Sequence, residues 1–310
     1  MRIYVLFVLV VISLFLISCN HKLTEPIQLP FNVESFNLKI LPYDSLWGVS
    51  NSIVPLDEEY PSDPEGVPPF LNSYDSTYYY HPVLIAQKGL NYINSYILTQ
   101  DIRYMLRVEG WINKLIDISF EINGSLYFPY NFNIHPHGCY QDTLFAPWFS
   151  GMAQGQVLQL LVRLFYVTEN YEYLQLADKV FQSFRNLSKE NYPWIAFVDG
   201  DGYYWIEEYP LPEPDHTLNG FIFAILGLYE YWLATKDPEV KLYIDAALTT
   251  LYVKLPLFRN PGGISYYCLK HHHQSAQYHI LHINLLKYLY RITGETFFLE
   301  FADSLYTDYH

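Results

Sequence analysis

The stretch Leu218–Pro238, LNGFIFAILGLYEYWLATKDP, contains the pattern from which the fold can be predicted. An apolar run with helical spacing ends at Thr235, a short polar link follows, and a second helix is expected to begin at Pro238. Proline suits the first turn of a helix. Asp237 before it is a good N-cap, because its side chain can accept a hydrogen bond from a free backbone N–H. The stretch therefore predicts two helices joined by a tight link.

This pattern occurs four times in the chain. Its apolar helical runs are Val83–Leu98, Gly151–Val167, Leu218–Ala234 and His279–Ile292. Second helices are expected at Ile102, Tyr171, Pro238 and Thr296, and Asp101 and Asn170 are further N-caps. The link threonines, at positions 99, 168, 235 and 293, are 69, 67 and 58 residues apart. We predict four αα-hairpins with a long, slightly variable period.

Three longer inserts separate the hairpins: Gly124–Ser150, Ser188–Thr217 and Lys254–Gln277. They contain strand-like pieces at Trp194–Val198, Tyr203–Ile206 and Ile264–Leu269. Tight links at one end and long inserts at the other predict a mainly α fold, an incomplete α/α toroid with short β-hairpin inserts on one rim. An open solenoid is the alternative. In both arrangements the inserts gather on one rim, where we expect the functional site.

The N-terminus, residues 1–18, has the features of a bacterial lipoprotein signal peptide. A positive Arg2 precedes the apolar run Ile3–Leu16, and the small residue Ser18 comes directly before Cys19. Cleavage there would leave a lipid anchor at Cys19, which predicts a membrane-attached protein of the bacterial cell envelope, at a periplasmic or outer-membrane face. An ordinary secretory signal is the alternative. In such an oxidising compartment Cys139 and Cys268 could pair.

Residues 19–80 are rich in proline and predict an extended segment that wraps the main domain, residues 81–310. Within it, Phe31–Leu41 alternates weakly like a strand. Hydrophobic residues make up 51% of the chain and charged residues 16%, so a well-filled core is expected. The net charge of −14 argues against nucleic acid as a partner. No cofactor is predicted, and the oligomeric state is left open, with a homodimer among the arrangements considered.

The rim stretch Trp205–Phe221, WIEEYPLPEPDHTLNGF, combines acids, aromatics and prolines before a helix. Its adjacent acids Glu207 and Glu208 would suit a paired-carboxylate hydrolase only if they could flank one bond. Neighbouring residues in an extended segment point to opposite sides, so this is disfavoured. The 31 tyrosines of the chain suit either a sugar-stacking surface or ordinary core packing.

Histidines are concentrated in and after the third insert. His279 and His282 share one helix face, and with the three consecutive histidines at 271–273, or with His135 and His137, they could ligate a metal. Buried, hydrogen-bonded histidines are the alternative. Adjacent histidines in a loop rarely point at one centre, so we predict no metal site.

Four ordered motifs resemble the C-terminal catalytic domain of the D-glucuronyl C5-epimerases, which convert D-glucuronate to L-iduronate in heparan-type chains. They are PWFSGMAQGQ at 147–156, EEYP at 207–210 with LNGF at 218–221, Tyr267-x-Leu269, and YHILHIN at 278–284. The resemblance covers roughly residues 80–306. It implies an α/α barrel and an isomerase that acts on a uronate-containing polysaccharide.

The resemblance also implies site residues. The family's active-site tyrosines match Tyr209, Tyr267 and Tyr278, and its neighbouring carboxylate matches Glu208. Substrate contacts are implied for Asn219, Lys270, Gln154, His279, His282 and Trp148. The chain departs from the family where Tyr-Asp-Leu-Arg-His becomes YCLKH at 267–271, and its loop to Tyr278 is shorter. Lysine lacks the bidentate fork of arginine, so these departures bear on substrate identity.

The chemistry of C5 epimerisation suits these residue types. The C5 hydrogen is weakly acidic until the adjacent carboxylate is neutralised, and inversion needs a proton acceptor and a donor on opposite faces. We expect Tyr209, aided by Glu208, and Tyr278 on opposing faces, with Tyr267 and Lys270 at the carboxylate. The same carbanion beside a leaving group at C4 would give β-elimination, so a polysaccharide lyase is the nearest alternative. A non-catalytic glycan-binding lipoprotein is the alternative from another class.

Overall fold

The computed structural model describes residues 29–56, 62–63, 66–190 and 192–310. The chain divides into two units, Met1–Pro30 and Phe31–His310, and every helix and strand described below belongs to the second. The predicted signal peptide and Cys19 lie outside the described residues. Among the helices that the structure describes, none has the length and apolar character needed to span a membrane.

The second unit contains the predicted hairpins. Its helices are α1 (Pro82–Thr99), α2 (Ile102–Asp117), α3 (Gly151–Thr168), α4 (Tyr171–Arg185), α5 (Leu218–Thr235), α6 (Pro238–Lys254), α7 (Ala276–Thr293) and α8 (Thr296–Asp308). The predicted starts of α2, α4, α6 and α8 are confirmed. Helix α7 begins three residues before the predicted His279, because its first turn is polar and lies outside the apolar period.

Each hairpin is closed by the same kind of link. The link threonine donates its hydroxyl to the carbonyl four residues earlier and accepts the N–H two residues later. The residue between adopts the left-handed conformation, with φ of 56–59° at three links and 80° at Gly294. The predicted N-caps are confirmed, since Asp101, Asn170 and Asp237 each accept from the N–H two residues on. The repeat is therefore one of hydrogen bonding as well as of sequence.

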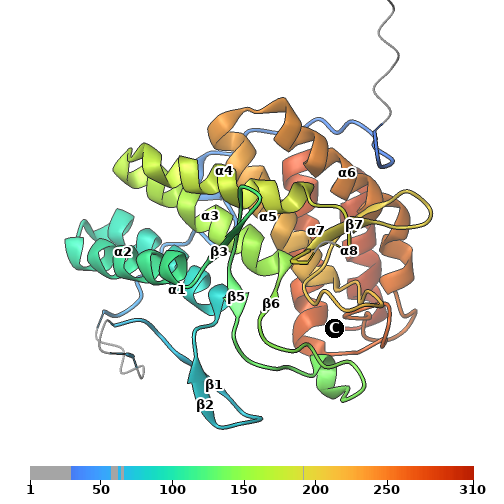
Figure 1. Ribbon diagram of the computed structural model, residues 1–310. Coiled ribbons are helices and arrows are strands. Elements are labelled where there is room, and N and C mark those ends of the chain that lie inside the picture. The colour runs from blue at the N-terminus through green and yellow to red at the C-terminus, as the bar shows by residue number, and fades with distance from the viewer. Residues whose placement is uncertain (1–28, 57–61, 64–65, 191) are drawn as a thin grey trace, which may run out of the picture. The chain divides into compact units, whose positions relative to one another are not determined.

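The helices form an incomplete α/α toroid, as predicted. The inner helices pack in the order α1, α3, α5 and α7, and each outer helix, α2, α4, α6 and α8, packs on its own inner partner. Figure 1 shows the hairpins following one another around the arc, from α1–α2 to α7–α8. Each outer helix returns the chain to the rim at which its hairpin began. The inner helices therefore all begin at one rim and end at the other.

Helices α3 and α5 make the closest approach in this arc. A Cβ added to Gly227 would lie 2.0 Å from the backbone oxygen of Gly155, and a Cβ on Gly155 would lie 2.5 Å from the Ala224 Cα. Further along the same interface the Arg163 guanidinium binds the Glu230 carboxylate at 2.6 and 2.8 Å, and both side chains are buried. The close contact and the ion pair together fix the two helices at the centre of the arc.

The rim opposite the tight links carries the inserts. The strands pair as antiparallel two-stranded ribbons: β1 (Phe70–Asn72) with β2 (Thr77–Tyr79), β3 (Phe120–Ile122) with β4 (Ser125–Tyr127), β5 (Pro129–Tyr130) with β6 (Trp148–Phe149), and β7 (Ala196–Val198) with β8 (Tyr204–Ile206). The first two predicted strand-like pieces are thus confirmed as β7 and β8. The third, Ile264–Leu269, forms only isolated bridges, from Tyr266 and Cys268.

Residues 31–56, which we call the belt, cross the far ends of the inner helices. The belt's backbone bonds to the C-terminal halves of all four inner helices, at Ile292 of α7, Tyr229 of α5, Arg163 of α3 and Ser95 of α1. The strand predicted at Phe31–Leu41 is wrong, because the N–H groups of this segment bond to helix side chains and to loop and helix carbonyls, with no ladder. Its apolar alternation instead buries Phe31, Phe36 and Leu38.

The α3–α5 contact predicts the effect of two glycine substitutions. Gly227→Ala should destabilise the protein by about 1–3 kcal/mol, because the new methyl group would overlap the Gly155 carbonyl and push the helices apart. Gly110→Ala in α2 is the matched control, since nothing lies within 4 Å of its added Cβ. It should stabilise by about 0.5–1 kcal/mol through helix propensity. Thermal and urea denaturation measure both, and equal effects would contradict the close contact.

Candidate active site

A cavity of about 290 Å³ lies where the four inner helices begin. It is lined from the first turns of α1, α3, α5 and α7, and by the ends of the inserts that precede them. The N-termini of α1 and α3 are capped by the side chains of His81 and Ser150, whereas Thr217 and Ser275 make no side-chain cap at α5 and α7. The partial positive charge of these helix ends favours an anionic group in the cavity.

Glu208 is the carboxylate of this cavity. It follows β8 and packs against the first turn of α5, where a Cβ on Gly220 would lie 2.4 Å from its Oε2. Tyr267 donates to the same oxygen at 3.0 Å, and the Asn219 amide donates to it at 3.5 Å. Burial raises the pKa of Glu208, and the bond from Tyr267 opposes this only in part. The Glu208 carboxyl therefore takes up and releases its proton at a pH nearer to neutrality than an exposed glutamate does.

Three tyrosines surround Glu208. Tyr209 and Tyr278 line the cavity, and the buried Tyr267 ring lies edge-on to Tyr278 with ring centres 4.5 Å apart. Burial, and next the negative charge of Glu208, raise the pKa of all three phenols. Each hydroxyl is thus held in its protonated, proton-donating form in the structure described.

The two adjacent glutamates point in different directions, as the extended backbone requires. The Glu207 carboxylate is fully buried and binds the His216 backbone N–H at 2.9 Å and its ring Nδ1 at 2.7 Å. It fixes the turn that precedes α5, and it does not line the cavity. Only Glu208 is available to a ligand there, which agrees with the argument against a paired-carboxylate hydrolase.

An aromatic wall completes the cavity. Trp148 stacks on Tyr130 with ring centres 4.0 Å apart, and the edge of His81 meets Tyr130 at 4.8 Å. Burial lowers the pKa of His81 to about 4, so its ring is neutral near pH 7. Of these residues the sequence pointed only to Trp148. The cap position of His81 before Pro82 was the available signal for the histidine.

Several residues implied by the resemblance lie elsewhere. The Lys270 ammonium binds Asp142 at 2.7 Å and Glu213 at 3.3 Å, and it is not among the lining residues. Buried Gln154 bonds to the Leu126 carbonyl and the Ser183 hydroxyl. His279 accepts from the Ser265 N–H and donates to carbonyls at the end of α8, and His282 contacts the Ser265 hydroxyl. The structure gives these four side chains internal partners.

As a result, the described part of the cavity wall contains no lysine or arginine. Asn219 and Gln87 supply amide groups there, and Asn219 Oδ1 is buried without a hydrogen-bond partner among the described atoms. A buried amide oxygen of this kind is suited to a hydroxyl donor from a ligand.

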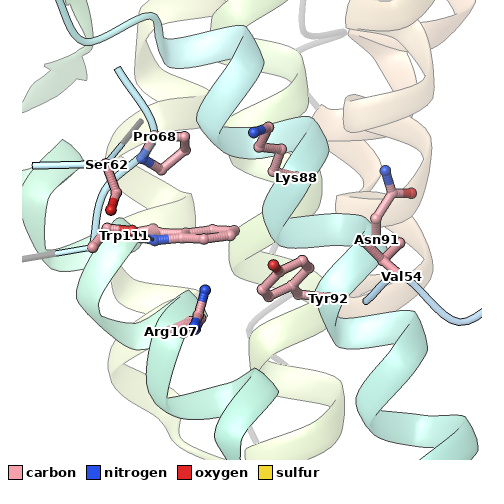
Figure 2. A pocket seen from close by; sticks show the side chains of 9 residues that line it. Val54, Ser62, Pro68, Lys88, Asn91, Tyr92, Arg107 and Trp111 are labelled. Carbon is pink, nitrogen blue, oxygen red and sulfur yellow. Dashed lines mark hydrogen bonds between the residues drawn. The ribbon is translucent and has the colours of Figure 1, made fainter. Parts of the chain in front are cut away.

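A second cavity, of about 280 Å³, lies between α1, α2 and the residues that precede α1. Figure 2 shows Lys88 and Arg107 around the Trp111 ring, with Tyr92 beside them. Its described lining residues include neither a carboxylate nor a histidine, so they offer no pair of groups for proton transfer near neutral pH. Of these two cavities, the first is therefore the one that offers acid–base candidates.

The cysteines do not pair, and His279 and His282 are buried and hydrogen-bonded, which is the alternative that the sequence offered to a metal site. Cys139 and Cys268 are both free thiols. His279 and His282 turn toward Ser265, and they do not converge with the histidine run at 271–273. Within the described residues, ligand-like geometry occurs in one group, formed by His137, Asp215, Cys268 and His271.

A family model described as "D-glucuronyl C5-epimerase C-terminus" matches residues 123–306. Among curated proteins, an uncharacterized protein of Methanocaldococcus jannaschii is 26% identical over 155 residues, which is 50% of each chain. The D-glucuronyl C5-epimerase of Caenorhabditis elegans is 28% identical over 175 residues, covering 50% of this chain and 28% of that protein. The chain thus spans half or less of these relatives.

Solved structures agree on the fold. Cellobiose 2-epimerase from Bacillus thermoamylovorans superposes with a TM-score of 0.52 at 12% identity, covering 76% of this chain and 63% of that one. The Lin0763 protein from Listeria innocua gives 0.51 at 14% identity, covering 73% and 60%. At such identities the likeness establishes the architecture alone.

The raised pKa of Glu208 predicts a pH-dependent effect of Glu208→Gln. Because the folded protein holds this proton more tightly than the unfolded chain, the wild type loses stability as pH rises through the raised pKa, starting from the ordinary value of 4.5. The neutral glutamine escapes this loss. The difference in melting temperature, variant minus wild type, should therefore grow between pH 4.5 and pH 8, and a constant difference would contradict an unfavourably buried carboxylate.

Proposed function

The chain belongs to the D-glucuronyl C5-epimerase family, and on this basis we propose that it is a carbohydrate epimerase that inverts C5 of uronate units in a polysaccharide. The observation that carries the proposal is the grouping of Glu208 with Tyr209 and Tyr278 in one cavity, where the buried Tyr267 hydroxyl also binds Glu208. Inversion needs two proton-transfer groups, and the cavity offers them from separate elements. Tyr209 follows β8, whereas Tyr278 lies in the first turn of α7.

In the proposed reaction the C5–H bond breaks and its electron pair moves into the adjacent carboxylate, giving an enediolate. Tyr209 and Glu208 act as one unit on the first face: ionised Glu208 draws the phenol proton as the phenolic oxygen takes the C5 proton. Tyr278 then gives its hydroxyl proton to C5 from the other face. The enzyme is regenerated when Glu208 releases its proton to solvent and the Tyr278 tyrosinate takes one up. The raised pKa of Tyr278 keeps the proton in place until it is needed.

The enediolate and the substrate carboxylate need stabilisation without a lysine or arginine from the described cavity wall. The amides of Gln87 and Asn219, and the uncapped first turns of α5 and α7, supply donors and partial positive charge. Tyr267, bound to Glu208, adds a third hydroxyl to this network. We give Lys270 no role at the carboxylate, because its ammonium is held by Asp142 and Glu213.

The aromatic wall suits a sugar polymer, because the stacked Trp148 and Tyr130 rings present apolar faces with polar tips. A lipid anchor at Cys19, proposed from the sequence, would place the enzyme at the bacterial cell envelope, beside extracellular or periplasmic glycans. The proposed partners are thus a uronate-containing polysaccharide and, through Cys19, a membrane.

The reaction is tested by incubating the protein with uronate-containing glycans in deuterated water. We expect deuterium at C5, L-iduronate-type units in the product and intact chains, measured by NMR and mass spectrometry. Tyr209→Phe and Tyr278→Phe should each lower the exchange rate by about 10²- to 10⁴-fold, since each removes one proton-transfer group. Tyr140→Phe is the control, because this ring is 71% exposed and lies outside the cavity.

Two other outcomes of this experiment would indicate the two alternative functions, a lyase and a glycan-binding protein. An ultraviolet-absorbing unsaturated chain end would make the protein a lyase, which forms the same carbanion and expels the C4 substituent. Glycan binding without exchange or cleavage would make it a binding protein. Full exchange in either cavity variant would contradict the assigned roles even if the wild type epimerises.

A further inference from the structure

We propose that His137, Asp215, Cys268 and His271 form a binding site for one zinc-class divalent ion beside the cavity. Each contributes one ligand atom, and the four atoms lie within 4.8 Å of one another. The residues come from three segments: the 3-10 turn Pro136–Gly138, the loop before α5, and the third insert. The sequence predicted no metal site because adjacent histidines in a loop rarely point at one centre, and here only one of the three consecutive histidines, His271, joins the cluster.

The distances suit ligands that share one centre. His137 Nε2 lies 2.5 Å from Asp215 Oδ2, and His271 Nδ1 lies 2.8 Å from Asp215 Oδ1 and 3.9 Å from the Cys268 sulfur. Bond lengths of about 2.0–2.3 Å around tetrahedral zinc place ligand atoms about 3.2–3.8 Å apart. The described spacings bracket this range, so an ion enters with small side-chain shifts that replace the histidine–carboxylate hydrogen bonds.

The donor set indicates the class of metal. Two imidazoles, one thiolate and one carboxylate suit zinc and disfavour magnesium or calcium, which take oxygen ligands. The two anionic ligands would balance the charge of a divalent ion at a place where Asp215 and Cys268 are both fully buried. Sulfur is the informative atom for the class of metal, because a thiolate ligand selects zinc over magnesium or calcium. In the structure described, the Cys268 thiol is hydrogen-bonded to Asp215 within the cluster.

An outer layer of polar contacts orients the ligands. His271 turns Nδ1 to the cluster and Nε2 to Asp142 at 2.6 Å, and Asp142 is held in turn by Lys270. A carboxylate behind a ligating histidine is the usual support of a zinc site. The Asp215 backbone carbonyl also accepts the N–H groups of Leu269 and Lys270, which wraps the Cys-x-x-His turn around it. Lys270 thus serves the cluster, in a positioning role.

Four protein ligands leave no open position, so the ion is structural and stabilises the rim. Its place beside the cavity is set by His137, whose ring centre lies 5.1 Å from that of Tyr267 and 5.7 Å from that of Tyr209. Joining the three segments at this point fixes the loops from which both tyrosines project. The inference stands on the cluster alone and does not depend on the proposed reaction.

The test uses the tag-free full chain with Cys19→Ser, which leaves Cys139 and Cys268 as the thiols. After loading with Zn²⁺ and dialysis against metal-free buffer, we expect one equivalent of zinc per chain and a melting temperature that falls when a chelator removes it. Co²⁺ in place of Zn²⁺ should give tetrahedral visible absorption and a near-ultraviolet thiolate charge-transfer band. Asp142→Asn should raise the Kd for Zn²⁺ about 10- to 100-fold.

Matched variants locate the ligands. Cys268→Ser should abolish the charge-transfer band, whereas Cys139→Ser should keep it; His272→Gln should keep it too, since that ring stacks on Tyr266 outside the cluster. A band that survives Cys268→Ser, or that Cys139→Ser removes, overturns the proposal. If Cys268→Ser does not fold, the wild type decides, because folded protein that holds no stoichiometric zinc or shows no thiolate band also overturns it.

Discussion

The contact between Gly155 and Gly227 is the constraint on which the rest of the fold depends. It brings the backbones of α3 and α5 closer than any side chain would allow, and it lies nearer to the insert rim than the Arg163–Glu230 pair does. A buried ion pair is costly unless all its polar atoms are satisfied. Here Gln159 donates to Glu230 and the Trp47 carbonyl accepts from Arg163, so the polar atoms of the pair have partners. The ion pair thus fixes how far α3 is shifted along α5.

Close packing at the centre also sets the character of the cavity. Glu208 packs against the first turn of α5, where a Cβ on Gly220 would lie 2.4 Å from its Oε2, and the carboxylate is buried from water there. The same burial raises the pKa of the carboxyl and of the three tyrosines around it. This burial costs folding free energy and leaves four ionisable groups with shifted pKa values in one place. Such clusters of shifted pKa values are common at catalytic sites.

Much of the architecture could be predicted from local sequence. The apolar period and the Thr-x-Asp or Thr-x-Asn links predicted the hairpins, because helix ends are determined by residues a few positions apart. The prediction of a strand at Phe31–Leu41 was wrong because this segment depends on long-range contacts. Its hydrogen-bond partners lie about 170 to 250 residues away, so no local pattern reveals them.

The candidate site was predictable to a smaller degree. Glu208, Tyr209, Tyr278, Asn219 and Trp148 do line one cavity, because the motifs that contain them stand at the starts of inner helices. Lys270, Gln154, His279 and His282 were expected near the substrate from motif membership, which carries no information on the direction of a side chain. Their partners, such as Asp142 for Lys270, are brought in by loops distant in sequence. His81 and Asp215 were missed for the same reason.

The belt has a consequence for the order in which the chain can mature. The Trp47 N–H bonds to the Tyr288 hydroxyl, and the Lys39 N–H bonds to the Ile292 carbonyl, so the belt is tied to helix α7, which is synthesised after α1 to α6. Until α7 has been synthesised, the part of the belt between Lys39 and Trp47 lacks its α7 partners. The fold of this unit is therefore completed only after α7 has been made, as expected for contacts of such long sequence separation.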